Sequence, residues 1–380
     1  MSLSEDIKDF ALDLGYSRVG ITTADGFPEH AAELKARYDQ YSFYLDSTLK
    51  PLDWADPRNV MPSARSIVSV VYDISKEAFP DKLIGKIGRF YQARFYIAPR
   101  HRINGSRRQL MRDFLEKNGC EVTVGRAVSE RRAASRAGII TFGKNTFGFA
   151  DGIGSWIGLT TFVVDAELEY DEPTLVVDCP PNCTACIDAC PTGALYEPMR
   201  MNPRRCIAYN CFTTIDGNPG GVTSYIPPDI REKMGAWIHG CDICQEACPR
   251  NQKRLKAKLP PNEFLEKKAR EFELTRVLNL TDEYYRTVVQ PLMYNYIKEK
   301  KYFQRNAAIA LGNTGDSAFI PDLAQAMEDP EELVRGYAAW GLGRIGGSQA
   351  KQILETSLAR ETFETARKEI EAALAAAQES

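Results

Sequence analysis

The cysteines are the residues of this chain most able to do chemistry, because they are crowded into one segment. Nine of the ten lie between Cys179 and Cys248, and only Cys120 lies outside it. The N-terminus has neither the basic nor the apolar stretch of a secretory signal, so we expect a cytoplasmic protein with reduced thiols. Clustered thiols in that compartment indicate metal binding rather than disulfides. Cys120, which follows Gly119, is predicted to be a small buried apolar residue.

Two groups of cysteines share one spacing. Residues 183–191 and 241–249 both read Cys-x-x-Cys-x-x-x-Cys-Pro. This is the signature of bacterial ferredoxins, in which closely spaced thiolates bind one 4Fe-4S cluster and the last cysteine ligates the other cluster. Two copies therefore predict two 4Fe-4S clusters. Zinc ribbons are the alternative, since Cys-x-x-Cys also binds zinc, but zinc does not require the repeated Cys-Pro ending.

With Cys179 and Cys206 added to the six cysteines of the two groups, crosswise ligation gives two sets of four ligands. The predicted ligands are Cys179, Cys183, Cys186 and Cys248 for one cluster, and Cys190, Cys206, Cys241 and Cys244 for the other. Two alternatives stay open, because the gap between Cys179 and Cys183 is one residue longer than usual and Cys211 competes with Cys206. Such clusters transfer single electrons, so the group that uses these electrons must lie elsewhere in the chain.

Short apolar runs between Gly-rich turns predict a mixed α/β domain over residues 1–175. A capping box formed by Ser2 and Glu5 begins a first helix, and a second helical face covers residues 107–118. Runs rich in β-branched residues predict strands at 18–22 and 66–71, and the segments 121–124, 138–142 and 159–165 are short apolar runs that alternate with Gly-rich turns. Residues 176–250 then form the predicted ferredoxin-like domain.

Residues 251–380 are helical and repeat themselves. The segment 307–315 (AAIALGNTG) aligns with 338–346 (AAWGLGRIG), and the same offset pairs Leu323 with Leu354. Small residues at close helix contacts, a glycine turn and an amphipathic helix are typical of HEAT repeats. The C-terminal domain is therefore predicted to consist of α-helical HEAT-like repeats.

The charge of the chain is nearly balanced. Lys and Arg number 48 and Asp and Glu 51, for a net charge of -3, which excludes an overall basic nucleic-acid binder. Local basic groups remain, with solvated helix faces as the alternative: Arg100, His101, Arg102, Arg107, Arg108 and Arg112; Arg131, Arg132 and Arg136; Lys298, Lys300, Lys301 and Arg305. No uncharged apolar stretch reaches the roughly 18 to 20 residues of a membrane span, so no membrane association is expected.

Segments along nearly the whole chain together resemble the epoxyqueuosine reductase family. They are VGITTA at 19–24, PSARSIV at 62–68, SER at 129–131, RAGI at 136–139, KN at 144–145, ACPTGAL at 189–195, RCI at 205–207, GCDIC at 240–244, QRNA at 304–307 and RGYAAW at 335–340. The cysteine region and the repeats are the most specific of these.

The resemblance implies a cytoplasmic oxidoreductase that depends on iron-sulfur clusters and cobalamin and is related in architecture to reductive dehalogenases. It implies reduction of the epoxide of a modified tRNA base in queuosine biosynthesis. The α/β domain is then expected to bind cobalamin, with His101, Lys144 and Asn145 as contacts, and the repeats to help hold tRNA. A monomer that takes electrons from an external donor such as a flavodoxin or ferredoxin is also expected.

The sequence departs from the family around its catalytic acid. The family's Val-Asp-Thr-Gly-Glu-Leu matches residues 123–128, which puts Val124 in place of the proposed proton donor, and the family's Asp-Tyr-His falls on 99–101. We therefore predict a divergent member or paralogue that reduces epoxyqueuosine poorly or not at all, with His101 and Glu130 as the nearest candidate acids. An electron-transfer or scaffold protein that has lost the cobalamin chemistry is the alternative.

Overall fold

The computed structural model describes residues 2–46, 50–92, 103–125, 128–174, 176–212, 225–293 and 299–377. The chain divides into two compact units. The first contains Met1–Ala78, Ala98–Arg204 and Ile243–Pro260, and the second contains Phe79–Ile97, Arg205–Asp242 and Pro261–Ser380. The boundaries 1–175, 176–250 and 251–380 stay a prediction.

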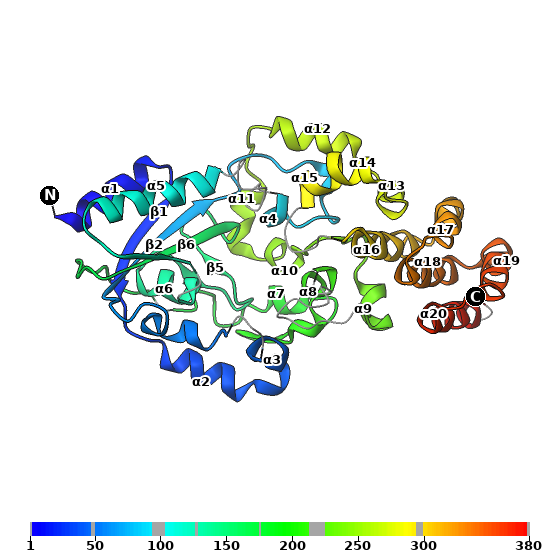
Figure 1. Ribbon diagram of the computed structural model, residues 1–380, viewed down its shortest axis with the longest axis horizontal. Coiled ribbons are helices and arrows are strands. Elements are labelled where there is room, and N and C mark those ends of the chain that lie inside the picture. The colour runs from blue at the N-terminus through cyan, green and yellow to red at the C-terminus, as the bar shows by residue number, and fades with distance from the viewer. Residues whose placement is uncertain are drawn as a thin grey trace. The chain divides into compact units, whose positions relative to one another are not determined.

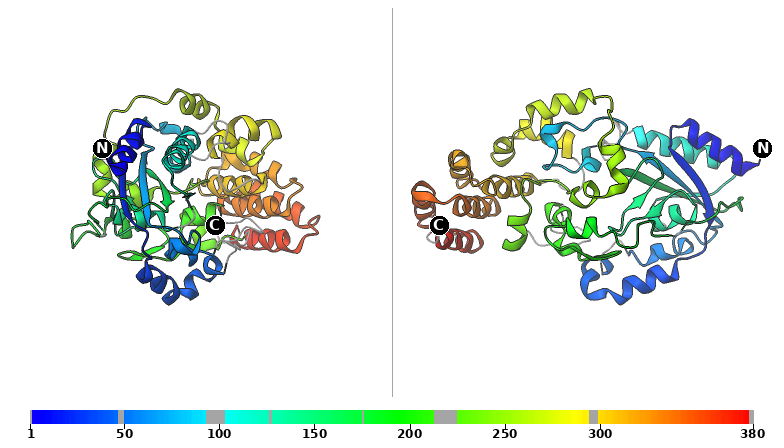
Figure 2. Two further views of the ribbon diagram at one scale, coloured as in Figure 1. Left: turned by 60° about the vertical axis from the view of Figure 1, so that its left-hand side comes forward. Right: turned by 180° about the vertical axis from the view of Figure 1, so that it is seen from behind.

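The first unit is built on an antiparallel sheet with the strand order β1-β2-β6-β3. The strands are β1 (Arg18–Thr23), β2 (Ser66–Asp73), β6 (Ile157–Val164) and β3 (Val122–Val124). Helices α1 (Leu3–Asp13) and α5 (Ile103–Lys117) cover one face, and α6 (Glu130–Arg136) covers the other (Figure 1). Figure 2 shows this layering from two further directions. The mixed α/β character predicted for this part of the chain is confirmed.

Local sequence signals explain the two helices on the first face. The Ser2 hydroxyl accepts from the backbone N–H of Glu5, and the Glu5 carboxylate accepts from the Ser2 N–H at 2.8 Å, which is the predicted capping box. On α5 the predicted helical face places Met111 and Leu115 in the core, fully buried. Cys120 is buried too, as predicted, and burial raises the pKa of its thiol.

A short hairpin carries Lys144 and Asn145. Its strands are β4 (Thr141–Phe142) and β5 (Gly148–Phe149). The turn is closed by two backbone hydrogen bonds, from Gly143 to the Phe147 carbonyl and from Thr146 to the Gly143 carbonyl, both of 2.9 Å. Thr146 adopts a left-handed conformation with φ of 69°. This tight turn fixes both side chains at the hairpin tip.

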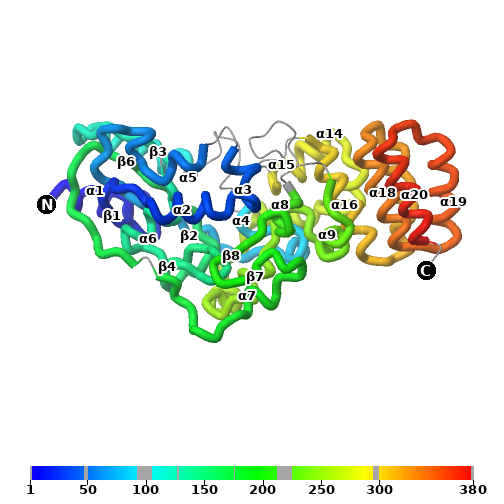
Figure 3. Tube along the Cα trace, turned by 90° about the horizontal axis from the view of Figure 1, so that it is seen from below, coloured from blue at the N-terminus to red at the C-terminus, as the bar shows by residue number. Residues whose placement is uncertain are grey.

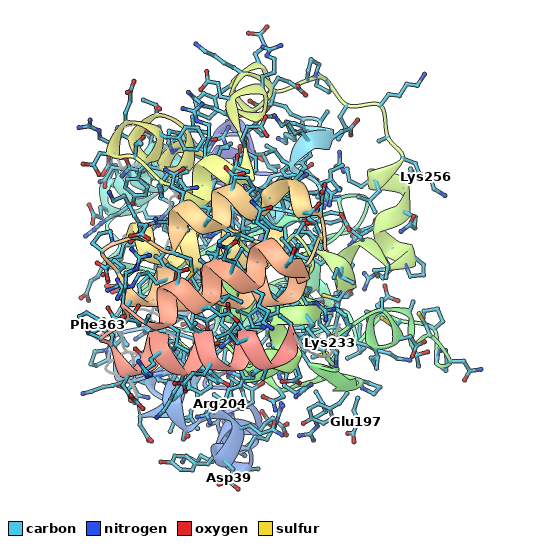
Figure 4. The ribbon with its side chains drawn as sticks, turned by 90° about the vertical axis from the view of Figure 1, so that its right-hand side faces the viewer. Asp39, Glu197, Arg204, Lys233, Lys256 and Phe363 are labelled. Carbon is cyan, nitrogen blue, oxygen red and sulfur yellow. The ribbon has the colours of Figure 1, made fainter. Side chains whose placement is uncertain are left out.

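A second hairpin follows the first cysteine group and packs on two N-terminal helices. Strands β7 (Leu195–Glu197) and β8 (Arg200–Met201) lie against α2 (Pro28–Ala36) and α3 (Tyr38–Leu45). The Arg37 guanidinium donates to the Met201 carbonyl at 2.8 Å, and Arg200 pairs with Glu33 at 2.6 Å. Figure 4 labels Asp39 of α3, Glu197 of β7 and the nearby Arg204 in this part of the first unit. These contacts anchor the chain that leaves the first cysteine group.

The remaining helices are short in the cysteine region and longer toward the C-terminus. They are α4 (Arg89–Gln92), α7 (Ala185–Asp188), α8 (Ile207–Phe212), α9 (Pro228–Lys233), α10 (Ile243–Glu246), α11 (Gln252–Leu255), α12 (Glu263–Glu271), α13 (Leu274–Leu278), α14 (Asp282–Tyr284), α15 (Gln290–Met293), α16 (Lys300–Gly312), α17 (Ile320–Ala326), α18 (Glu332–Ile345), α19 (Gly347–Leu358) and α20 (Glu364–Ala376). Among the described residues, no helix combines the length and apolarity needed to cross a bilayer.

The second unit contains the predicted helical repeats, and its last three helices lie side by side (Figure 3). Glycines allow these helices to touch. A Cβ on Gly312 of α16 would lie 2.7 Å from the Gly341 Cα on α18, and a Cβ on Gly343 would lie 2.8 Å from the Ala373 Cα on α20. No side chain fits at such distances. The small residues noted in the repeats therefore set the spacing of the stack.

A buried ion pair joins α9 to α20 in the second unit. The Arg231 side chain is fully buried and donates to both Glu369 carboxylate oxygens, at 2.6 and 2.7 Å. Its Nε also donates to the Ile226 carbonyl at 2.6 Å, and its guanidinium stacks on the Tyr337 ring. The loss of one partner would leave an uncompensated buried charge.

We expect Glu369→Gln to lower the free energy of unfolding by about 3 kcal/mol, measured by urea denaturation with the clusters intact. The matched control is Glu364→Gln on the same helix, because Glu364 pairs with Lys368 at 3.1 Å in solvent. That control should cost less than about 0.5 kcal/mol. Equal losses for the two variants would contradict a special role for the buried pair.

Candidate metal-cluster site

Four of the predicted thiol ligands lie near enough in the structure to act on one another's charge. Three come from the loop and helix at Cys179, Cys183 and Cys186, and the fourth is Cys248 after α10. Burial raises the pKa of the Cys186 thiol, and the neighbouring Cys248, Cys179 and Cys183 thiols raise it further. Burial likewise raises the pKa of Cys248, with smaller contributions in the same direction from Cys179 and Cys183. Four thiols that influence one another in this way form a sulfur-rich site.

Cys206 and Cys211, the two competing candidates, differ in their surroundings. Cys206 is half-buried, whereas Cys211 is fully buried and its thiol donates to the Trp237 and Gly240 carbonyls at 3.8 and 3.7 Å. Burial raises the pKa of the Cys211 thiol to about 12. A thiol must lose its proton to bind iron, so the surroundings of Cys211 are those of a structural residue.

Two buried polar side chains hold the backbone at Cys211. The Asn306 amide donates to the Cys211 and Ile238 carbonyls, both at 2.8 Å, and the Arg305 guanidinium donates to the Asn210 carbonyl at 2.9 Å. Arg305 was grouped with surface lysines on the basis of sequence, but it is fully buried. It therefore braces this segment and adds no charge to the protein surface.

The lysines of the same basic group are paired with acids. Lys300 contacts Asp282 at 2.6 Å, and Lys301 contacts Glu299 at 3.1 Å. Lys298 lies outside the described residues. The burial of Arg305 removes it from the predicted basic surface. The contribution of Lys300 and Lys301 to that surface stays a prediction.

Lys144 and Asn145 contact the cysteine loops. The Lys144 ammonium donates to three backbone carbonyls, those of Pro180 at 3.0 Å, Pro181 at 2.7 Å and Cys183 at 2.9 Å. The Asn145 amide donates to the Cys244 carbonyl at 3.4 Å. The hairpin tip therefore contacts both cysteine groups, a placement that the sequence did not reveal. The role of Lys144 and Asn145 in binding cobalamin stays a prediction.

Glu130 lies close to the position at which the family's acid is missing. Val124 packs against the apolar core beneath α1 and α5 and has no proton to give. A Cβ on the next residue, Gly125, would lie 3.8 Å from Glu130 Oε1. Burial raises the pKa of Glu130 to about 7, although Arg108 and Arg131 act to lower it. Such a carboxyl carries its proton about half of the time at neutral pH.

His101, the other candidate acid, lies outside the described residues. In the basic group of Arg131, Arg132 and Arg136, two arginines make hydrogen bonds within the first unit. Arg136 donates to the Thr23 and Asp25 carbonyls at 2.8 and 2.7 Å, and Arg131 donates to the Thr146 carbonyl at 2.6 Å. Within the part of the chain that the structure describes, Glu130 is the candidate acid placed beside Gly125.

Comparison with known families supports both the cysteine domain and the repeats. The family model of the 4Fe-4S double cluster binding domain matches residues 179–251, and that of HEAT repeats matches residues 290–375. These matches confirm the predicted double 4Fe-4S cluster domain and the predicted HEAT-like repeats.

Comparison with individual proteins extends over the whole chain. Epoxyqueuosine reductase of Bacillus subtilis is 30% identical over 396 residues, covering 97% of this chain and 94% of its own. The protein of the same name from Staphylococcus aureus is 29% identical, covering 95% and 94%. A crystal structure of epoxyqueuosine reductase with an epoxyqueuosine-modified tRNA-Tyr stem loop has a TM-score of 0.83 and 27% identity, over 99% of each chain.

Proposed function

This chain belongs to the epoxyqueuosine reductase family, and we propose on that basis that it reduces an epoxide on a tRNA nucleoside with electrons that pass through its two 4Fe-4S clusters. The observation that carries this proposal is the match of residues 179–251 to the 4Fe-4S double cluster binding domain, which contains the sulfur-rich site of Cys179, Cys183, Cys186 and Cys248. Its four thiols are the donor set that a 4Fe-4S cluster requires, so the residues fit the group. When bound, the clusters supply one-electron transfer.

The second cluster is proposed to be ligated by Cys190, Cys206, Cys241 and Cys244. The choice of Cys206 is supported by the burial of Cys211 and by its thiol contacts with two carbonyls. We propose no metal-binding role for Cys211.

A cobalamin that receives the electrons is supported by family membership. All three N–H groups of the Lys144 ammonium donate to carbonyls of the cysteine loop, and the Asn145 amide donates to the Cys244 carbonyl. We therefore propose that Lys144 serves the cluster site, and the contact of Lys144 and Asn145 with cobalamin stays a prediction.

Glu130 is proposed to supply the proton that Val124 cannot. Conversion of an epoxide to an alkene consumes two electrons and two protons and releases the oxygen as water, so an acid must protonate the departing oxygen. The position of the Glu130 carboxyl beside Gly125 and its raised pKa support this role. Because Glu130 approaches from a different element than the family's aspartate, we expect activity that is low but measurable.

The partners follow from the same proposal. The tRNA-bound relative supports tRNA as the substrate. The clusters must be filled one electron at a time from outside, so a flavodoxin or ferredoxin is the proposed donor, and the chain is proposed to act as a monomer.

Expression in a cell that lacks its own epoxyqueuosine reductase tests the function. We expect nucleoside analysis of tRNA to show queuosine below the normal level but above that of the empty-vector control. Full queuosine would show that the departure at Val124 has no cost, and none from a protein that holds both clusters would favour an electron carrier. Val124→Asp alone should not restore the full level, because Pro99 and Arg100 also differ from the family.

A further inference from the structure

Lys144 is a buried cation at the edge of the sulfur-rich site. It is 9% exposed, and its side chain reaches from the hairpin tip to the loop between Cys179 and Cys183. Three carbonyls accept hydrogen bonds from one nitrogen. A neutral amine has only two N–H groups, so three donated bonds require the charged ammonium.

In the described part of the chain, no acid pairs with the charge of Lys144. Within the ranges that the structure describes, all of its observed polar contacts are backbone carbonyls, and no carboxylate forms an ion pair with it. Arg250, the cation next to Cys248, differs in this respect, because it pairs at 3.2 Å with Asp178, whose side chain is 65% exposed. Arg250 also acts on the cysteine site, since it lowers the pKa of Cys248, but solvent and a carboxylate screen part of its charge. The Lys144 ammonium lies directly on the backbone of the loop from Pro180 to Cys183.

We propose that the positive charge of Lys144 raises the reduction potential of the cluster held by Cys179, Cys183, Cys186 and Cys248. This rests on the cluster assignment made above. Reduction adds one electron, and hence one negative charge, to a cluster that already carries four thiolates. A fixed positive charge in a buried site favours the more negative state, and net charge is one of the factors that set cluster potentials. The electron itself comes from the external flavodoxin or ferredoxin.

A loop brace is the competing role for the same contacts. A brace would act through its hydrogen bonds alone. A neutral side chain of similar length would then change the stability of the loop, but the reduction potential of the cluster held by that loop would stay the same wherever the cluster is still bound. A charge would act through the potential even when the loop is intact. The two roles are therefore separable by redox measurement.

The experiment compares the unaltered chain with three variants, Lys144→Met, Lys144→Gln and Lys144→Arg, and with one control variant. All are purified full-length proteins that are reconstituted anaerobically. Iron and sulfide content is measured first, because a chain without two clusters contradicts the assignment and not the role of Lys144. Electron paramagnetic resonance during redox titration then gives the midpoint of each cluster. Lys253→Met on α11 is the control, since that lysine is exposed on the helix after Cys248.

We expect both neutral variants to keep their iron and to lower one of the two midpoints. At a fixed potential the ratio of reduced to oxidised cluster should fall at least about tenfold, which is 59 mV for a one-electron couple. Lys144→Arg and Lys253→Met should stay near the unaltered value. An unchanged midpoint in a fully loaded neutral variant would overturn the proposal. So would loss of the cluster from both neutral variants, because it would show that the side chain acts as a brace.

Discussion

Replacing Glu130 by glutamine is expected to lower the rate of epoxide reduction at pH 7 by about 100-fold or more. A positioned general acid contributes on the order of 100 to 10,000-fold, and glutamine keeps the size of the side chain without a transferable proton. The pKa of about 7 adds a second signature. Only the protonated carboxyl is active as an acid, so the rate should fall as the pH rises through about 7, and Glu130→Gln should remove this dependence.

Single-turnover assays with chemically reduced protein and epoxyqueuosine-containing tRNA measure this rate without an external donor. Glu167→Gln is the control, because that carboxylate is 73% exposed and pairs only at 3.5 Å with Arg65. Its pH profile should match that of the unaltered chain. If Glu130→Gln retained both the rate and the pH dependence, another group would have to deliver the proton, with His101 the next residue to replace.

Replacing Cys206 by serine is expected to remove one of the two clusters, so that iron and sulfide fall to roughly half. The hydroxyl of serine is a much poorer ligand to iron than a thiolate at neutral pH. Without this cluster, electron transfer to the substrate should stop. Anaerobic metal analysis and paramagnetic resonance of the reduced protein measure the loss.

Cys211→Ser is the matched comparison, since a serine hydroxyl can donate to the same Trp237 and Gly240 carbonyls. Both clusters should remain, with a small loss of stability from the poorer fit of the hydroxyl. The reverse pattern, with iron lost from Cys211→Ser and kept in Cys206→Ser, would exchange the roles of the two residues.

Features that depend on nearby residues could be predicted from the sequence. The Ser2 capping box, the buried face of α5 and the repeated glycines of α16 and α18 each depend on a local pattern, and all are found as expected. The spacing of the cysteines is local in the same sense, and the double cluster domain that it predicts is confirmed over residues 179–251.

Features that depend on where distant segments meet could not be predicted. Arg305 is basic and therefore looked exposed, yet it is buried against the backbone of Asn210. Lys144 belongs to a family motif, but the motif does not show that its ammonium donates to the Pro180 and Cys183 carbonyls, which the structure does. Burial also decides the acidity of Glu130, and no spacing rule reports burial of a single carboxyl.

The meeting of Cys186 with Cys248 has a consequence for how the protein is made. Translation adds about 5 to 20 residues per second, so Cys248 is synthesised roughly 3 to 12 seconds after Cys186. During that interval the nascent chain carries three of the four thiols and lacks the last. A complete cluster site therefore does not exist until synthesis has passed Cys248, and iron-sulfur delivery to this site is a late step in the maturation of the polypeptide.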